Sequence, residues 1–230
     1  MNSSSLEHGI DAYYDGEYET SYKILLPIAQ EGDVEAQFLV GRMLYKGFGV
    51  KQDYEQAFKW LFKAAQAGNE RAQCFVGCAY RDGNGVKISF PKARFWLNAA
   101  AGSGSRRALS CLGDIYLRGH GVPQNYKKAY DFFLKASELD DPVAICNLGW
   151  FYEHGYVVEK SLQKAIDLYE KSASLGCAHS FYNLGTIYLH GKGRFKNLKM
   201  ARECLEKAAR RDDIEAIALL EKINSENNSD

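Results

Sequence analysis

The chain has 230 residues, of which 46% are hydrophobic and 25% are charged, as in ordinary globular proteins with enough apolar material for a continuous core. Its 29 basic and 29 acidic side chains cancel, which removes the positive field that a dedicated nucleic-acid-binding protein carries. The sequence has no apolar run of membrane-spanning length and no apolar segment behind a basic N-terminus. We therefore expect a cytoplasmic protein that binds no nucleic acid and does not insert into membranes. Export without a cleavable signal stays open.

A single unit recurs every 36 residues along most of the chain. Alanine or serine occupies one phase of this repeat, at Ala36, Ala72, Ala108, Ala144, Ser180 and Ala216. Glycine occupies a second phase, at Gly41, Gly77, Gly113, Gly149 and Gly185. Self-similarity with a period between about 20 and 50 residues is typical of solenoid proteins. The sequence therefore predicts an array of equivalent units.

The array divides into a cap, five full units and a closing helix. Residues 1–32 predict an N-terminal capping unit, with helices over 6–15 and 18–31 joined by a turn at Gly16. Each full unit then has a first helix (helix A), a glycine-containing loop and a second helix (helix B). The five units span 33–68, 69–104, 105–140, 141–176 and 177–212. A closing helix over 213–224 and a disordered tail over 225–230 complete the chain.

Helix A carries a glycine in its middle and ends at another. Each mid-helix glycine costs up to about 1 kcal/mol relative to alanine, so we expect the close approach of a neighbouring helix to offset that cost. Helix A should end where a residue can adopt positive φ, at Gly47, Gly83, Gly119, Gly155 and Gly191. A further loop glycine recurs as Gly49, Gly85, Gly121 and Gly193. Val157 replaces it in the fourth unit, so we expect that loop to bend differently.

Helix B has a recurring start and a recurring apolar face. Residues that cap helices well stand at its start, at Asp53, Ser89, Asn125, Ser161 and Asn197. Its buried face should carry Ala57, Ala93, Ala129, Ala165 and Ala201. One turn later the expected buried residues are Trp60, Trp96, Phe132, Leu168 and Cys204.

The recurring pattern is Ala-x-x-x-Leu-Gly-x-x-Tyr-x-x-Gly-x-Gly-Val, then Asp, Asn or Ser, then Lys-Ala-x-x-Trp-x-x-Lys-Ala-Ala. It resembles the Sel-1-like repeat, a relative of the tetratricopeptide repeat, over about residues 33–220. The N-terminal unit resembles a tetratricopeptide repeat. The resemblance implies an all-α fold, a right-handed α/α superhelical solenoid whose A helices line a concave surface. It also implies a non-enzymatic scaffold or adaptor that binds another protein or peptide there.

A cysteine-rich branch of the same family suggests a second function. Its members resemble this chain, carry a disulfide between helix B and the next helix A, and are associated with β-lactam hydrolysis. The positions of the first cysteine of each pair are occupied here by Ala65, Ala101, Ser137, Ala173 and Ala209. The secreted, disulfide-linked form is therefore not expected. A weak β-lactamase or cell-wall-peptide hydrolase activity remains the alternative function.

The spacing Ser-x-x-Lys, which β-lactam-hydrolysing enzymes use for their nucleophile, occurs at Ser89–Lys92 and Ser161–Lys164. Asn125–Lys128 fills the same slot without a nucleophile. The repeat itself accounts for both serines as helix B caps, and no Lys-Thr-Gly partner occurs. We expect no catalytic residue.

The metal-ligating residue types are also sparse. Cys74 and Cys78 could offer two thiolates from one helix face, but a structural zinc site needs four ligands. His154 and His190 share a repeat phase, yet helices in adjacent repeats lie about 10 Å apart, too far for the pair to hold one ion. Reduced cysteines packed as small hydrophobes are expected. The sequence therefore predicts no metal site and no cofactor.

Tetratricopeptide geometry, carried over to helix A, predicts which side chains face the concave surface. The partner-binding candidates are Phe38, Arg42, Tyr45, Lys46, Arg71, Arg81, Arg107, Asp114, Arg118, Trp150, His154, His179, Tyr182 and His190. Exposed Trp, Tyr and Arg dominate interface hot spots, and arginine pairs with carboxylates. We expect a monomer that binds a peptide with acidic groups and an apolar anchor near Trp150. The alternative is that these residues are ordinary solvated charges and partly packed aromatics.

Overall fold

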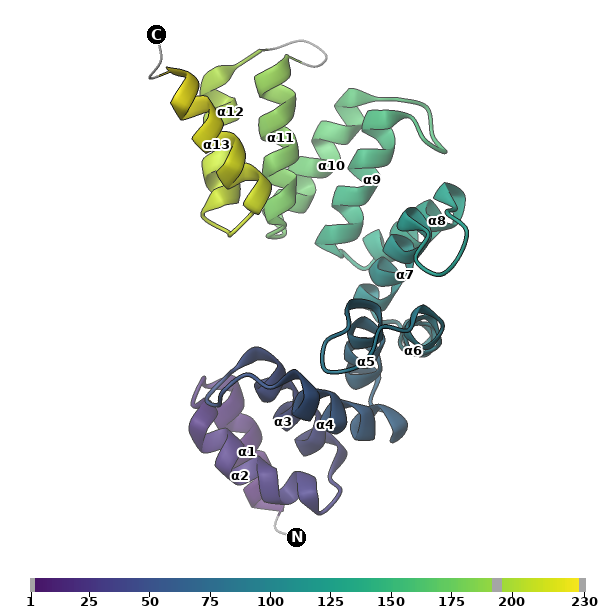
Figure 1. Cartoon of the computed structure of the whole chain (residues 1–230), viewed down its shortest axis with the longest axis vertical. Helices are drawn as coiled ribbons and strands as arrows, with labels where there is room; N and C mark the ends of the chain where they lie inside the picture. The colour runs from purple at the N-terminus through teal and green to yellow at the C-terminus, as the bar shows by residue number, and fades with distance from the viewer. Residues whose placement is uncertain (1–2, 192–195, 228–230) are drawn as a thin grey trace. The chain divides into compact units, whose positions relative to one another are not determined.

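The computed structural model describes residues 3–191 and 196–227, where the chain forms helices and no strand (Figure 1). The helices are α1 (Ser3–Tyr14), α2 (Tyr18–Gln30), α3 (Val34–Lys46), α4 (Tyr54–Gln66), α5 (Glu70–Asp82), α6 (Phe90–Gly102), α7 (Arg106–Arg118), α8 (Tyr126–Ser137), α9 (Pro142–His154), α10 (Leu162–Ser174), α11 (Ala178–His190), α12 (Leu198–Ala209) and α13 (Ile214–Asn227). The expected all-α fold is confirmed.

The chain divides into two compact parts, with the boundary inside α7. We call them unit 1 (Met1–Leu112) and unit 2 (Gly113–Asp230), and each contains several of the 36-residue repeats. In unit 1, α1 packs on α2, α3 on α4 and α5 on α6, while α2 and α4 each contact the helix that follows. In unit 2, α9 packs on α10 and α11 on α12, and α13 covers α12 (Figure 1). Within each unit these helices pack against their neighbours in the sequence, which is the arrangement that a repeat array requires.

The expected helix ends are confirmed by the backbone. Helix A is followed by a left-handed glycine wherever the sequence predicts one, with φ between 64° at Gly191 and 80° at Gly83. Asp53, Asn125, Ser161 and Asn197 cap helix B by accepting a hydrogen bond from the backbone N–H three residues later. Ser89 occupies the same N-cap position without a side-chain capping bond. The short polar residues at this phase therefore fix the start of helix B.

The mid-helix glycines allow helices A and B of one repeat to approach closely. A Cβ on Gly41 would lie 2.8 Å from Cγ of Leu61 and 3.1 Å from its backbone N, and a Cβ on Gly77 would meet Leu97 at 2.6 Å. At Gly113 and Gly149 the same position is taken by the rings of Phe133 and Tyr169. The expected close approach of a neighbouring helix is confirmed. That neighbour is helix B of the same repeat, which is α4, α6, α8, α10 or α12.

The buried face of helix B differs from the expectation by one residue. The alanines at the Ala57 phase are buried as predicted. The large core residues, however, are Leu61, Leu97, Phe133, Tyr169 and Leu205, each at most 1% exposed. Trp60 and its equivalents are only half-buried. Positions three and four after the alanine both lie on its helix face, and the glycine of helix A receives the second of them.

The loop at Val157 does not bend differently, contrary to expectation. Val157 has φ of 66°, the same as Gly49 and close to 71° at Gly85 and 65° at Gly121. The recurring helices and loops of the repeats, which we call the repeat frame, therefore impose the left-handed conformation even on a β-branched residue. That conformation is strained for such a residue. The expected glycine equivalent, Gly193, lies outside the described residues.

The closing helix is longer than expected. α13 continues to Asn227, so three residues of the expected tail are helical. No glycine or proline interrupts the chain between Ile214 and Asn227, and the helix therefore has no breaker at the expected boundary. Residues 228–230 lie outside the described part of the chain.

Candidate partner-binding site

Unit 2 contains a hollow of about 330 Å³ to which three successive A helices contribute side chains. It is lined by Leu117, Arg118, Gln124, Tyr126, Asn147, Trp150 and His179, which we call the unit 2 hollow. Three of these residues are predicted site residues, Arg118 at the end of α7, Trp150 on α9 and His179 near the start of α11. The structure therefore brings together predicted residues that lie up to 61 positions apart in the sequence.

The repeat frame positions the walls of the hollow. Arg118 is the last residue of α7, and Tyr126 follows the N-cap residue Asn125 of α8. The loop between them is held because the Gln124 side-chain amide donates to the Leu117 carbonyl at 2.7 Å. Asn147 similarly donates to the carbonyl of Val143 at 2.8 Å. Each amide nitrogen thus donates one internal hydrogen bond, and the second N–H and the amide oxygen can serve as donor and acceptor for a partner's polar groups.

An aromatic cluster forms one side of the hollow. The Trp150 ring stacks on Tyr156 with centroids 5.3 Å apart, and Tyr156 stacks on Tyr126 at 4.7 Å. His154 lies 4.7 Å from Trp150, and its Nδ1 is 2.9 Å from the Trp150 carbonyl oxygen. Tyr156 is 42% exposed and Trp150 is half-buried. Large amphipathic rings held by stacking lose little conformational entropy on binding, so this cluster suits an apolar contact.

The charged side of the hollow is Arg118. Its guanidinium pairs with Asp114 one turn earlier, with Nε and Oδ1 2.6 Å apart, while the Arg118 side chain stays 64% exposed. An exposed pair of this kind contributes about 0.5 kcal/mol or less. The pair therefore orients Arg118 but does not prevent it from contacting a ligand carboxylate.

Unit 1 instead brings three of its four predicted arginines onto aromatic rings. The Arg42 guanidinium lies 5.4 Å from the Tyr13 ring, Arg71 4.3 Å from Phe38, and Arg107 5.1 Å from Phe75. Each arginine comes from the helix A that follows the helix of its ring. Such contacts contribute about 0.5–1 kcal/mol at exposed sites. These three contacts therefore stabilise the packing of successive A helices in unit 1.

Two of the unit 1 arginines already face carboxylates. Arg71 forms an ion pair with Glu35. Nε and Nη2 of Arg81 donate to the two carboxylate oxygens of Asp82 at 2.7 and 2.9 Å, and this hydrogen bonding raises the pKa of Arg81. The repeat period did not indicate the Arg71–Glu35 pair, because Glu35 comes from the preceding repeat. The expected acidic ligand would therefore have to compete for Arg71 and Arg81.

One predicted site residue is wrong. Phe38 is 1% exposed because the Arg71 side chain and the Phe75 ring cover it, so a partner cannot reach it. The other candidates are at least partly exposed: Arg42, Tyr45, Lys46, Arg71, Arg81, Arg107, Asp114, Arg118, Trp150, His154, His179, Tyr182 and His190. Tyr182 stacks on His179 at 5.2 Å. His190 lines a separate hollow between α11, α12 and α13.

The described cysteines are free, and four of the six are buried, as the expected packing role requires. Cys111 joins Cys74 and Cys78 in unit 1, and the sulfurs of Cys78 and Cys111 are 3.4 Å apart. The hydrogen bond to Cys78 and burial raise the pKa of Cys111. Sequence reasoning missed this contact, because Cys111 occupies a different repeat phase from either partner.

A second thiol pair lies in unit 2. Cys177 stands at the N-cap of α11, where the other A helices have Asp, Asn or Ser, and it makes no capping hydrogen bond. The hydrogen bond from Cys146 lowers the pKa of Cys177 to about 5, against the effect of burial. Cys146 itself has a raised pKa through the same contact and its burial. Of the two thiols, Cys177 is therefore the one that ionises more readily.

The Ser-x-x-Lys spacing has a structural explanation. Ser161 Oγ accepts a hydrogen bond from the backbone N–H of Lys164 at 3.4 Å. The Lys164 ammonium lies 5.2 Å from the centre of the Tyr152 ring, and Lys92 lies 5.3 Å from that of Tyr80. Each lysine is thus placed over a tyrosine ring of its own repeat, where it is not positioned as a base for the serine.

Helix pairs that repeat at a fixed period, with a left-handed glycine after each helix A, define an α-solenoid repeat protein. The Sel1 repeat model matches residues 34–69, 70–105, 108–141, 142–177 and 179–213, well over half of the chain. The chain therefore belongs to the Sel1 repeat family. Proteins built from these repeats typically mediate protein–protein interactions.

Solved structures agree with this assignment. A Sel1 repeat protein from Oxalobacter formigenes is 29% identical, with a TM-score of 0.79, over 95% of this chain and 89% of that one. A protective antigen of uropathogenic Escherichia coli with the same fold is also 29% identical, with a TM-score of 0.71 over 92% of this chain. The match covers 46% of that antigen, so this chain spans about half its length.

A more distant structure shows the fold alone. An immunity protein from Pseudomonas aeruginosa is 19% identical, with a TM-score of 0.60, over 88% of this chain and 81% of that one. No curated protein matches the chain significantly. None of the helices that the structure describes has both the length and the apolar character needed to cross a membrane.

Proposed function

We propose that this chain is a non-enzymatic scaffold that binds a peptide segment of a partner protein in the unit 2 hollow. The observation that carries the proposal is the convergence of Arg118, Trp150 and His179 on one hollow. These residues belong to positions that change between repeats, so the frame does not require them. A site made from non-recurrent residues on a recurrent frame is how repeat proteins acquire individual partners.

The size and lining of the hollow indicate what it binds. Its volume of about 330 Å³ is near the lower end for ligand pockets, so it suits one or two side chains of a peptide. The rings of Tyr126 and Trp150 offer an apolar contact, and Arg118 offers paired N–H donors. We expect the partner segment to carry a large apolar or aromatic residue close to a carboxylate.

Selection of displayed peptides on the full chain tests this specificity. Selected sequences should pair an aromatic or large aliphatic residue with Asp or Glu. Affinity can be followed by fluorescence in a Trp60→Phe, Trp96→Phe background, in which Trp150 is the remaining indole. Binding should change the emission of Trp150, because the ligand lies against its ring.

A matched pair of charge reversals tests the site. Arg118→Glu should weaken binding at least tenfold, because the carboxylate of the peptide would then face a like charge. Arg210→Glu is the control, since Arg210 is also exposed and also pairs with an acid four residues earlier, Glu206, but does not line the hollow. Equal affinity of both variants and the unmodified chain would overturn the assignment of this site.

The hydrolase alternative draws no support from the geometry. The lysines that would activate Ser89 and Ser161 lie over Tyr80 and Tyr152, and Ser161 is used as a helix cap. We therefore expect no turnover of a chromogenic β-lactam by the purified chain. Turnover that Ser161→Ala removes would contradict the scaffold proposal.

A further inference from the structure

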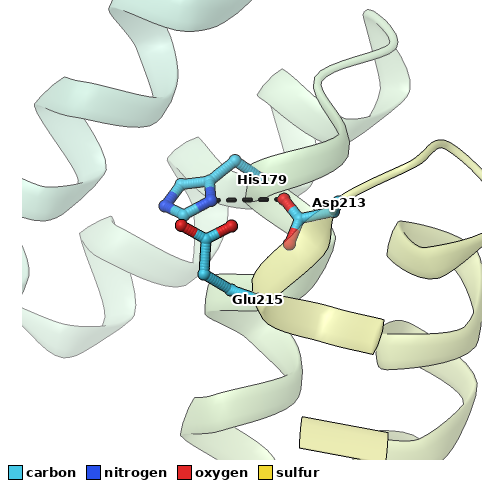
Figure 2. A group of neighbouring side chains, drawn as sticks. All are labelled: His179, Asp213 and Glu215. Carbon is cyan, nitrogen blue, oxygen red and sulfur yellow. Dashed lines mark hydrogen bonds and ion pairs between the residues drawn. The ribbon is translucent and has the colours of Figure 1, made fainter. Parts of the chain in front are cut away.

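His179, Asp213 and Glu215 form a cluster of metal-ligating side chains in unit 2 (Figure 2). His179 is the second residue of α11, and Asp213 and Glu215 flank the start of α13. One ligand atom of each residue lies within 4.8 Å of the other two. The side chain of Asp213 is 5% exposed, whereas those of His179 and Glu215 reach solvent. The cluster is thus a nitrogen donor and two carboxylates with access from solvent.

The equivalent junction between the first two repeats of unit 1 has a different set of charges at these three positions. Glu35, Asn69 and Arg71 stand 144 positions, or four repeats, before His179, Asp213 and Glu215. There Asn69 donates to Glu35 at 3.4 Å, and Arg71 forms an ion pair with Glu35. One negative and one positive charge balance. In unit 2 the same three positions hold two carboxylates and one imidazole, so negative charge is in excess even when the imidazole is protonated.

The distance between His179 and Asp213 also favours a bridging ion. Nδ1 of His179 lies 3.3 Å from Oδ2 of Asp213, longer than the roughly 2.7–2.9 Å of a charge-assisted N–H···O bond. Two ligand atoms about 2.0–2.1 Å from one tetrahedral zinc ion are about 3.3–3.4 Å apart. The pair therefore has the separation of two ligands of one ion and not that of a tight ion pair.

The local structure holds the buried carboxylate in position. Oδ1 of Asp213 accepts a hydrogen bond from the backbone N–H of Ala216 at 2.9 Å as the N-cap of α13. This bond fixes the carboxylate and leaves Oδ2 directed at His179 (Figure 2), as an outer hydrogen bond orients a metal ligand. The N-terminus of α13 contributes about half a positive charge, which two carboxylates outweigh.

We propose that His179, Asp213 and Glu215 bind a divalent metal ion, with Zn²⁺ the best match to one imidazole and two carboxylates. Imidazole and carboxylate are both zinc ligands. Glu215 is exposed, so its side chain can rotate to complete the set. Three protein ligands leave a fourth position for water or for an exogenous carboxylate. The site lies at the junction of the last repeat with the closing helix, where the ion would link α11 to α13.

Zinc titration of the full chain tests the proposal by calorimetry. We expect one Zn²⁺ ion to bind, and Asp213→Asn and Glu215→Gln each to weaken binding at least tenfold. Asn is as good an N-cap as Asp, so Asp213→Asn removes a ligand charge without removing the cap of α13. His190→Gln is the control, because His190 is an exposed histidine at the other end of α11; its affinity should be unchanged.

Two further measurements separate this site from the six cysteines. The Co²⁺-loaded chain should show absorption of a nitrogen- and oxygen-ligated ion, without the intense bands of cobalt–thiolate charge transfer. The double variant His179→Glu, Glu215→Arg rebuilds the unit 1 ion pair, and its Tm should no longer rise with Zn²⁺. Thiolate bands in the cobalt spectrum, or zinc affinity unchanged in Asp213→Asn and Glu215→Gln, would overturn the proposal.

Discussion

At the scale of single residues, the repeat frame holds Val157 in a backbone conformation that is unfavourable for valine. Val157 adopts the left-handed conformation that glycine adopts at the same phase in other repeats. A side chain in this region costs about 1–2 kcal/mol, whereas glycine loses about 0.5–1 kcal/mol through the greater freedom of the unfolded chain. The strain at Val157 therefore exceeds the entropic advantage of keeping a side chain there.

Val157→Gly should accordingly raise the free energy of unfolding by about 0.5–1 kcal/mol. Urea unfolding followed by circular dichroism measures the change. Val158→Gly is the matched control, because Val158 is not among the described residues with positive φ, and it should lower stability. If both substitutions destabilise the chain equally, Val157 is not strained.

Cys177 is a residue whose chemistry follows from its contact with Cys146. Its pKa is lowered to about 5 because Cys146 hydrogen-bonds to it, so the folded state favours the thiolate. The stabilisation is fully present above the unfolded pKa of about 8.5. It declines as the pH falls and is lost below about 5.

The rate of alkylation by iodoacetamide, measured by mass spectrometry against pH, should show this directly. Cys177 should remain reactive well below pH 7, because the thiolate is the nucleophile. Cys204 is the control, since it is also partly buried but its pKa is raised, chiefly by burial. Reaction of Cys177 only above pH 8 would show that its thiol is not activated.

At the scale of helices, the contact between helix A and helix B depends on the absence of a side chain. A Cβ at position 77 would lie 2.6 Å from Cγ of Leu97 and 3.1 Å from the Leu97 backbone N. The backbone atom cannot rotate away, so α5 and α6 would have to separate. Gly102, on α6 of the same pair, has no atom within 4 Å of its Cβ position.

Gly77→Ala should therefore destabilise the chain by about 1–3 kcal/mol, the usual cost of overpacking a core. Gly102→Ala should instead stabilise it by up to about 1 kcal/mol, because alanine favours the helix and restricts the unfolded chain. Urea midpoints of the two variants give the comparison. Stabilisation by Gly77→Ala would show that the two helices do not touch at this glycine.

Helix boundaries and caps could be predicted because each recurs at a fixed phase with a local cause. Gly47 ends helix A through its own backbone conformation, and Asp53 begins helix B with its own side chain. The choice between Trp60 and Leu61 as the core residue could not be predicted in this way. Both lie on the face of Ala57, and the contact of Leu61 with Gly41 on another helix decides between them.

At the scale of the whole molecule, the residues that recur in every repeat maintain the helix packing. The residues that change between repeats form the candidate binding sites. The sequence predicted Arg118, Trp150 and His179 as binding residues from helix A geometry, and the structure places all three in one hollow. It also predicted Phe38, which is buried because Arg71 from the next repeat covers it. Contacts between repeats, which depend on pairs of changing residues, are what the period alone does not specify.

Contacts between repeats also explain why no sequence motif indicates the proposed zinc site. The repeat period relates residues of equal phase, such as His154 and His190. The cluster instead joins residues of different phase, because the N-cap Asp213 of one helix reaches His179 of the preceding helix A. The equivalent contact of Asn69 with Glu35 shows that this geometry belongs to the frame.

The affinity of a selected peptide for Trp150→Ala and Trp60→Ala tests the central claim most directly. Trp150 lines the unit 2 hollow, whereas Trp60 is the recurrent residue of helix B in the first repeat and lies beside Lys63. The account predicts that Trp150→Ala costs about 2 kcal/mol or more, a roughly 30-fold loss of affinity. Trp60→Ala should leave the Kd unchanged. Unchanged affinity of Trp150→Ala, measured on folded protein by calorimetry, would contradict the account.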